Sequence, residues 1–151
     1  MAAFVHRLRV RYAECDPQGW VFNAHYLAYF DVALTELWRE AIGPYGEMVE
    51  QGVDMVVAES QLRYLAPAHF DQELEISLEI ERLGNTSMTT DVTMCVGSTA
   101  VVRGRVRHVF IAIEGAEKGE KVEIPLWIRR GLERFVGSAP EPDTEPAPEA
   151  S

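Results

Sequence analysis

One long amphipathic helix near the start of the chain, followed by a series of strands, limits the possible folds most. Between residues 24 and 42, apolar side chains recur at steps of three and four and form a single stripe. Asn23 is expected to cap the helix start, and Gly43-Pro44 is expected to end the helix. A helix with one apolar stripe must bury it against another element. The residues of the stripe are Leu27, Phe30, Leu34, Leu37, Trp38 and Ala41.

Most of the remaining chain is predicted to form strands. Leu74, Ile76, Leu78 and Ile80 alternate with polar residues, which is typical of a half-buried antiparallel strand. Further strands are expected over residues 4–12, 53–65, 88–96 and 99–113, with a loop over 46–52 and a short amphipathic helix over 125–135. We therefore expect an α+β domain in which four strands form a meander after the helix, and the helix lies inside the curl of one sheet.

The charge distribution separates a domain from a tail. The 151 residues carry a net charge of −10, which argues against nucleic-acid binding because phosphates need a cationic surface. After Gly137 the chain is rich in Pro, Ala and acidic residues and has no Lys or Arg. We expect one domain over residues 1–136 and a disordered tail over 137–151.

The chain is expected to be a cytoplasmic protein. No apolar run approaches the roughly 20 residues that a membrane-spanning helix needs, and the first residues do not resemble a signal peptide. Cys15 and Cys95 match no metal-binding spacing, so they are expected to be free thiols in a reducing compartment. No set of His, Cys and acidic residues has convincing zinc spacing, and no metal or organic cofactor is expected.

A polar turn, Asp16-Pro17-Gln18-Gly19, precedes the helix. From their chemistry alone, Asp16 and Pro17 are expected to open this turn, and Gly19 permits the positive φ that completes it. The wider segment resembles the signature of the 4-hydroxybenzoyl-CoA thioesterase family, a branch of the hotdog superfamily. The family pattern is an Asp, a small residue or Pro, a Gly, a hydrophobic pair, and a closing Asn or His and Tyr before the long helix. A second similar segment is Arg63-Tyr64-Leu65-Ala66-Pro67-Ala68, and the resemblance covers roughly residues 5–135. The residues that carry the first motif are Tyr12-Ala13-Glu14-Cys15-Asp16-Pro17-Gln18-Gly19-Trp20-Val21-Phe22-Asn23-Ala24-His25-Tyr26.

This resemblance implies a hotdog fold, in which a five-stranded antiparallel sheet wraps around a long central helix, and an acyl-CoA thioesterase activity. It makes Asp16 the catalytic nucleophile or general base, and the backbone N–H of Asn23 the donor to the thioester oxygen. A helix start suits that task because it offers unpaired N–H groups where negative charge develops. By the same resemblance, the substrate-contacting residues are Gly19, His25 and Tyr26, and the CoA-binding residues are Arg82 and Asn85.

The sequence departs from the family at two places. Relatives associated with the bacterial cell envelope often carry His where this chain has Asn23, and the nearest imidazole here is His25. The family often uses several basic residues at the hairpin after the third strand, where this chain has only Arg82. Another hotdog branch places its working acid on the helix, where Asp31 and Glu36 are the candidates.

Alternative functions therefore stay open. Because the hairpin at Arg82 has few basic residues to bind CoA phosphates, the first alternative is a thioesterase that acts on acyl groups carried by acyl carrier protein. A dehydratase would pair a His with an acid, and a non-catalytic acyl-CoA-binding module would not need Asp16. The acyl group is not identified, because Trp20, Phe22, Tyr26 and Phe30 suit aromatic and aliphatic groups alike.

Self-association is expected as well. A single sheet on a single helix leaves an edge strand whose backbone groups can pair with a second copy. The resemblance implies a homodimer or homotetramer, with sites that lie between subunits.

Overall fold

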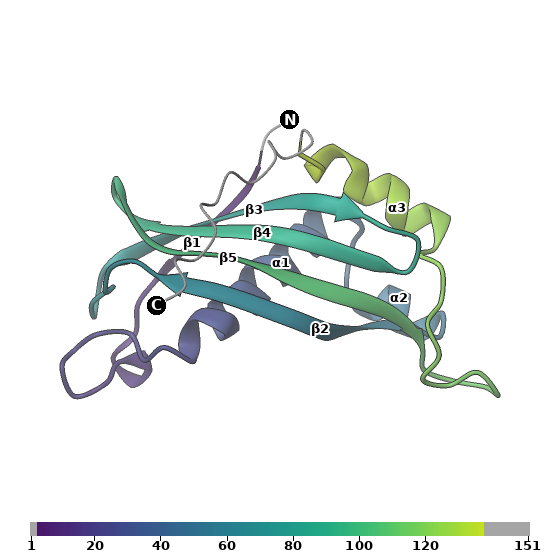
Figure 1. Ribbon diagram of the computed structural model, residues 1–151, viewed down its shortest axis with the longest axis horizontal. Helices are drawn as coiled ribbons and strands as arrows, with labels where there is room; N and C mark the ends of the chain where they lie inside the picture. Colours follow the sequence, from purple (N-terminus) through teal and green to yellow (C-terminus); the bar gives the residue numbers. More distant parts are fainter. Residues whose placement is uncertain (1–2, 138–151) are drawn as a thin grey trace, which may run out of the picture.

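The computed structural model describes residues 3–137 (Figure 1). The tail predicted over residues 137–151 lies outside the described residues except for Gly137, whose N–H donates to the Ile80 carbonyl. The strands are β1 (Phe4–Arg9), β2 (Val53–Tyr64), β3 (Glu73–Leu83), β4 (Ser87–Val96) and β5 (Thr99–Ala112). The helices are α1 (His25–Ala41), α2 (Gly46–Glu50) and α3 (Leu126–Leu132), with single 3₁₀ turns η1 (Tyr12–Glu14) and η2 (Glu133–Phe135).

All five strands form one antiparallel sheet, which confirms the predicted α+β class. Its strand order is β1-β3-β4-β5-β2. The predicted meander of four strands is wrong, since only β3, β4 and β5 follow one another, and β2 pairs with β5 instead of β3. The cause lies in the connection from β2 to β3, which is not a hairpin loop. It bonds to the loop before α1, where Val21 N–H donates to the Ala68 carbonyl and Trp20 forms a bridge with His69, so the chain crosses the end of the sheet.

α1 covers one face of the sheet and lies behind it in Figure 1. Phe30 stacks on His108 of β5 at a ring-centroid distance of 6.1 Å, and Trp38 lies 6.4 Å from Phe110. The predicted stripe is mostly buried, although Leu27 at its start is 37% exposed. The core combines this helix face with the inward side chains of β3, β4 and β5.

Both ends of α1 lie close to the predicted positions, but the expected cap is wrong. Ala24 occupies the N-cap position with helical dihedral angles and no side-chain hydrogen bond. The chain already turns before the helix, because His25 N–H donates to the Phe22 carbonyl, and Asn23 lies inside this turn, one position before the N-cap. At the other end, Gly43 has a φ of 126°, as expected for a glycine that terminates a helix.

The segment predicted as a loop over residues 46–52 contains one helical turn, α2. Met48 anchors this turn because its side chain is 1% exposed. Two adjacent apolar residues, Met48 and Val49, in five positions leave no periodicity that a sequence pattern can reveal.

Candidate active site

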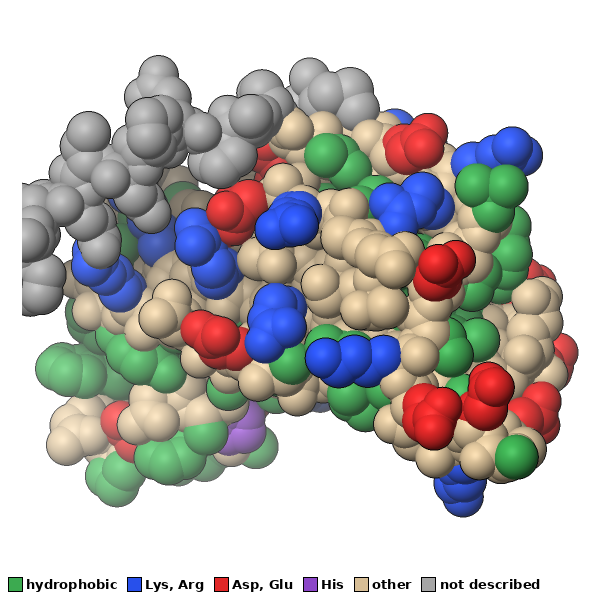
Figure 2. All heavy atoms as spheres, turned by 45° about the vertical axis from the view of Figure 1, so that its right-hand side comes forward, with side chains coloured by type: hydrophobic (Ala, Val, Ile, Leu, Met, Phe, Trp, Pro, Cys, Tyr) green, Lys and Arg blue, Asp and Glu red, His purple; other side chains and the backbone are tan. Residues whose placement is uncertain are grey.

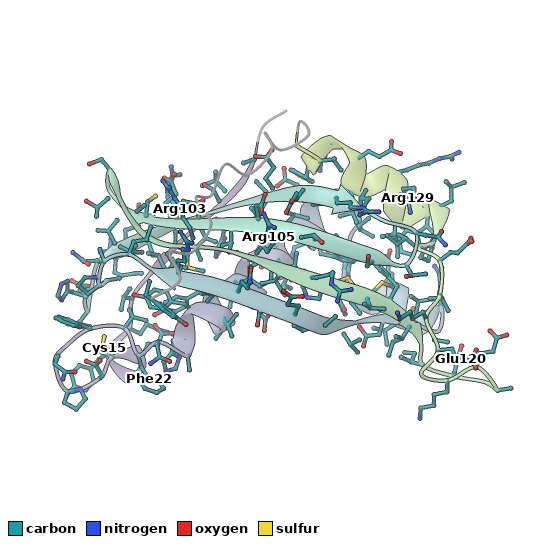
Figure 3. The ribbon with its side chains drawn as sticks, in the orientation of Figure 1. Cys15, Phe22, Arg103, Arg105, Glu120 and Arg129 are labelled. Atoms are coloured by element: carbon teal, nitrogen blue, oxygen red, sulfur yellow. The ribbon has the colours of Figure 1, made fainter. Side chains whose placement is uncertain are left out.

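The loop between η1 and α1 is closed by backbone bonds around Asp16. Asp16 N–H donates to the Trp20 carbonyl at 2.8 Å, and Gly19 N–H donates to the Asp16 carbonyl at 2.9 Å. Gly19 has a φ of 79°, which a side chain would strain, so the predicted turn is confirmed. A bridge between Cys15 and Val21 joins the two arms of the loop. Cys15 and Phe22 mark the ends of this loop at one end of the molecule in Figure 3.

Backbone N–H groups bond to one of the two oxygens of the Asp16 carboxylate. Oδ1 accepts the N–H groups of Gln18 at 3.0 Å and Trp20 at 3.2 Å. The Gln18 side chain faces the same carboxylate, with its nitrogen 3.1 Å from Oδ2 in the orientation that satisfies both groups. The turn therefore fixes the carboxylate while Oδ2 accepts no backbone N–H among the described residues.

The N–H groups in front of α1 are available. Across residues 3–137, no hydrogen-bond acceptor is found for the N–H of Asn23 or of Ala24. The first bond of the turn runs from His25 N–H to Phe22, and Tyr26 N–H reaches the Asn23 carbonyl only at 3.4 Å. Free backbone donors at the positive end of a 17-residue helix are the kind of group that stabilises an oxyanion.

Asp16 and Asn23 line the same open hollow, whose volume is about 360 Å³. Its remaining walls are mostly apolar, and it has no Lys or Arg in its lining. The site therefore offers a carboxylate and a helix start beside a surface for an apolar group. The other lining residues are Trp20, Val21, Tyr26, Tyr64, Leu65, Ala66 and Pro67.

This arrangement can be compared with known proteins. The family profile described as Thioesterase superfamily matches residues 18–103, more than half of the chain. The chain belongs to the thioesterase superfamily. The match begins two residues after Asp16 and includes α1 and four of the five strands in whole or in part.

Individual relatives agree with the family assignment. A putative esterase of Aquifex aeolicus is 29% identical over 122 residues, which are 81% of this chain and 91% of the relative. The acyl-CoA thioester hydrolase YbgC of Escherichia coli is 35% identical over 81 residues, 54% of this chain and 60% of YbgC. The crystal structure of a hypothetical protein of Aquifex aeolicus superposes with a TM-score of 0.79 at 28% identity, covering 85% of this chain and 98% of that protein. The predicted hotdog fold and the predicted enzyme class, thioester hydrolysis, are thereby confirmed.

Of the two predicted substrate-contacting residues on the first turn of α1, Tyr26 lines the hollow and His25 does not. Tyr26 is 3% exposed, and its hydroxyl oxygen accepts the Ala68 N–H at 3.3 Å. Burial is the main cause that raises the pKa of Tyr26, so its phenol stays protonated at neutral pH. His25 packs edge-on against Phe22 at 6.2 Å and does not line the hollow. Tyr26 is thus a wall that also ties α1 to the β2–β3 connection.

The predicted CoA-binding residues lie far from Asp16 within one chain. Arg82 and Asn85 belong to the β3–β4 hairpin, at the end of the sheet beside α3, whereas the Asp16 loop lies at the other end (Figure 1). Arg9, just before the loop, pairs with Glu73 at the start of β3, and ten residue steps at about 3.3 Å separate that point from Leu83. β3 therefore spans about 33 Å between its end beside the Asp16 loop and the hairpin that follows Arg82.

A second hollow, of about 280 Å³, lies on the outer face of the sheet. Arg105 is one of its lining residues and forms ion pairs with Glu81 at 3.2 Å and with Asp91 at 3.6 Å. Basic and acidic side chains are interspersed over the sheet face in Figure 2. This hollow holds an ion-paired surface and no group from the Asp16 loop. Its lining residues are Glu59, Gln61, Glu81, Arg82, Thr89, Arg105 and Arg107.

Other reactive groups near the site have ordinary roles. Cys15 and Cys95 are free, as expected. Burial, followed by the nearby charges of Asp16 and Glu14, raises the pKa of Cys15, so it stays a thiol and is a poor nucleophile. Among residues 3–137, no group of three or more His, Cys, Asp or Glu side chains is arranged to hold a metal ion. In the same range, no helix is long and apolar enough to span a membrane.

Two parts of the site were missed as site residues by the sequence reasoning. Tyr64, Leu65, Ala66 and Pro67 form one wall of the hollow, and the sequence signal for them was their place in the second similar segment. Glu14, a buried carboxylate beneath the loop, gave no signal beyond its place in the first motif.

Proposed function

We propose that this protein hydrolyses acyl-CoA thioesters, with Asp16 as nucleophile or general base and the start of the central helix α1 as oxyanion hole. The observation that carries this proposal is that Asp16 and Asn23 line one hollow. The acyl-CoA activity in the name of the relative YbgC supports the choice of substrate class.

In the general-base form of the reaction, water attacks the thioester carbonyl carbon while Asp16 takes one of its protons. The carbonyl oxygen becomes an oxyanion that the N–H groups of Asn23 and Ala24 stabilise. The C–S bond then breaks, and the proton on Asp16 passes to the leaving thiolate. In the nucleophilic form, Asp16 attacks the carbonyl carbon itself, the C–S bond breaks, and the CoA thiolate leaves, so that a mixed anhydride forms. Water then hydrolyses the anhydride, which releases the carboxylic acid and restores the Asp16 carboxylate, and a proton from this water passes to the thiolate.

The phosphates of CoA need a cationic surface that the Asp16 hollow of one chain does not provide. We propose that Arg82 and Asn85 reach the CoA bound at Asp16 of a neighbouring subunit. The same observation favours one alternative substrate, an acyl group on acyl carrier protein, since docking of a carrier needs a protein surface more than a nucleotide pocket.

A dimer through β2 fits this arrangement. β2 is an edge strand of twelve residues, with Val56 43% and Val57 56% exposed. Pairing of this edge with a second copy would satisfy its backbone groups and cover these side chains. We propose a homodimer, with a homotetramer as the larger form, and a cytoplasmic location in which Cys15 and Cys95 stay reduced.

A substrate panel tests the function. Hydrolysis of aryl, short-chain and long-chain acyl-CoAs is followed by release of the free thiol, and the same acyl groups on acyl carrier protein are measured beside them. We expect turnover of at least one acyl-CoA, with kcat/KM higher than for the same acyl group on the carrier. Preference for the carrier would establish the alternative, and no turnover of either would refute thioester hydrolysis.

A further inference from the structure

Glu14 is a buried carboxylate that the proposed reaction does not use. The residue is 8% exposed and lies in η1, two positions before Asp16. A buried charge persists only where hydrogen bonds and opposite charge offset the loss of water. The contacts of the Glu14 carboxylate therefore indicate which segments it joins.

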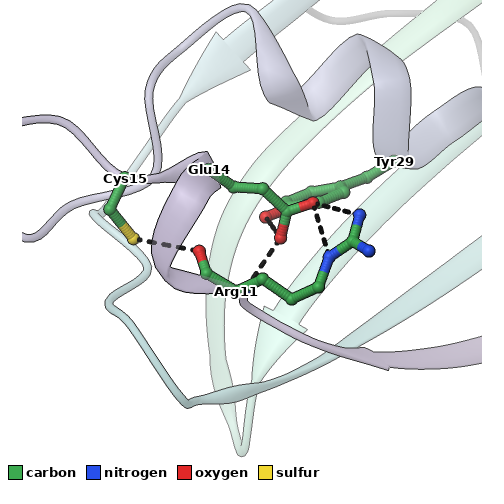
Figure 4. Close-up of polar contacts among 4 residues, drawn as sticks. All are labelled: Arg11, Glu14, Cys15 and Tyr29. Atoms are coloured by element: carbon green, nitrogen blue, oxygen red, sulfur yellow. Dashed lines mark hydrogen bonds and ion pairs between the residues drawn. The ribbon is translucent and has the colours of Figure 1, made fainter.

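Both oxygens of Glu14 are occupied (Figure 4). Oε1 accepts the Arg11 backbone N–H at 2.8 Å and the Tyr29 hydroxyl at 3.0 Å. Oε2 accepts the Arg11 guanidinium at 3.0 Å and 3.3 Å. Burial alone would raise the pKa of Glu14, but the bonds from Arg11 and Tyr29 outweigh it and lower the pKa below its ordinary value.

These contacts join three segments at the base of the Asp16 loop. Arg11 follows β1, Tyr29 lies on the second turn of α1, and the Glu14 carbonyl accepts the Phe22 N–H at 2.9 Å. Phe22 immediately precedes Asn23, so Glu14 ties the arm that carries Asp16 to the arm that carries the proposed oxyanion donor. Its side chain fixes the same loop to α1.

From this geometry we infer that Glu14 is a positioning residue, whose carboxylate sets the placement of Asp16 against the start of α1. Glu14 itself does not line the hollow. Its loss is therefore expected to lower kcat more than it changes KM, because a misplaced catalytic group costs turnover even when the substrate still binds. The inference rests on the proposed function of Asp16.

The kinetic test is a double-mutant cycle of Glu14→Gln with Asp16→Asn. Glutamine keeps the shape but turns an amide donor toward Arg11 or Tyr29. We expect Glu14→Gln to lower kcat about 10- to 100-fold, the scale of a small misplacement, and to have little further effect when Asp16 is already Asn. Tyr29→Phe removes one bond to Glu14 and should give a smaller loss in the same direction. An equal loss in both backgrounds, or no loss, would overturn the inference.

A second readout does not depend on turnover. The N–H groups of Gln18 and Trp20 bond to Asp16 Oδ1, so their hydrogen exchange reports on the Asp16 turn. We expect faster exchange at both in Glu14→Gln. The matched control is Glu75→Gln, which removes another carboxylate paired with an arginine, Arg7, at 2.9 Å on the exposed sheet surface. Exchange at Gln18 and Trp20 should be unchanged in this control.

The two readouts separate the two proposals. If the chain hydrolyses no thioester, or if Asp16→Asn turns over normally, the proposed function fails and the exchange rates alone decide the role of Glu14. Unchanged exchange in Glu14→Gln would then show that Glu14 does not hold the Asp16 turn.

Discussion

At the scale of single residues, His108 is a buried imidazole in the core. It is 5% exposed, its ring stacks on Phe30, and its Nδ1 has no hydrogen-bond partner among the described residues. Burial lowers its pKa from 6.5 to about 4. Between these two values the unfolded chain binds a proton at His108 that the folded chain does not bind. The free energy of unfolding must therefore fall as the pH falls through this range.

The first prediction follows from that pKa. Replacement His108→Phe keeps a ring against Phe30 and removes the titration, so it should flatten the loss of stability between pH 6.5 and pH 4. For a pKa shift of this size, the free energy of unfolding that the titration of His108 removes is up to about 3 kcal/mol. Thermal or urea unfolding at several pH values measures it.

Glu14 acts in a different pH window. Its lowered pKa means that it contributes stability above the pKa of the unfolded carboxyl group, and that this stability is lost as the pH falls through its folded pKa. This loss begins below pH 4.5, the ordinary value of a glutamate, whereas the loss from His108 begins at 6.5. A pH slope that persists between 6.5 and 4.5 in His108→Phe would contradict the assignment to His108.

At the scale of elements, β2 and β5 approach closely at Gly104. A Cβ at this position would meet the Gln61 carbonyl oxygen and would lie 2.6 Å from Leu62 Cδ2. The backbone of β2 would have to move, because a carbonyl in a strand ladder cannot swing aside as a flexible side chain can. Gly104 thus keeps β2 at hydrogen-bonding distance from β5 along the proposed subunit edge.

The second prediction is that Gly104→Ala destabilises the protein by about 1–3 kcal/mol, the usual range for overpacking. The matched control is Gly46→Ala in α2, where an added Cβ meets nothing within 4 Å and the backbone φ is not positive. Chemical unfolding of the two variants should differ clearly. Equal stability of both variants would show that the β2 backbone can move away from the added Cβ without a loss of unfolding free energy.

Sequence periodicity predicted the elements better than their arrangement. Leu74, Ile76, Leu78 and Ile80 are all fully buried as the alternation required, and α1 ends at the expected glycine. Strand order was not predictable in this way, because periodicity shows which face of a strand is buried and not which strand lies beside it. The crossing of the β2–β3 connection depends on backbone bonds to Val21 and Trp20, which leave no pattern in the sequence.

The candidate site was predictable in part for the same reason. The turn at Asp16 follows from local chemistry, and the structure places it beside the start of α1. The wall from Tyr64 to Pro67 and the support from Glu14 depend on long-range contacts. The distance between Arg82 and Asp16 also emerges only once the direction of β3 is known.

At the scale of the whole molecule, the two ends of the proposed CoA site lie at opposite ends of one sheet. The Asp16 hollow contains the proposed reacting groups and apolar walls, and Arg82 lies near the far end of β3, beside its hairpin. An assembly that joins two sheets would bring parts of different chains together. The exposed edge of β2 is the surface that we propose for this contact.

The third prediction is that Val57→Glu disrupts the proposed dimer, because it places a charge among apolar side chains on this edge. Sedimentation at micromolar concentration should show a dimer or tetramer for the unchanged protein and a monomer for Val57→Glu. Leu126→Glu, at a 59% exposed position on α3, is the control and should keep the assembly. A monomer that is fully active would refute the shared site.

The most direct measurement is the turnover of Asp16→Asn on the acyl-CoA that the unchanged protein hydrolyses best. Asparagine can accept the same N–H bonds from Gln18 and Trp20 but cannot act as base or carboxylate nucleophile. We predict an unchanged fold by circular dichroism and a kcat lower by about two orders of magnitude or more. Near-normal turnover in the folded variant would contradict the role of Asp16 and transfer attention to the helix acids Asp31 and Glu36.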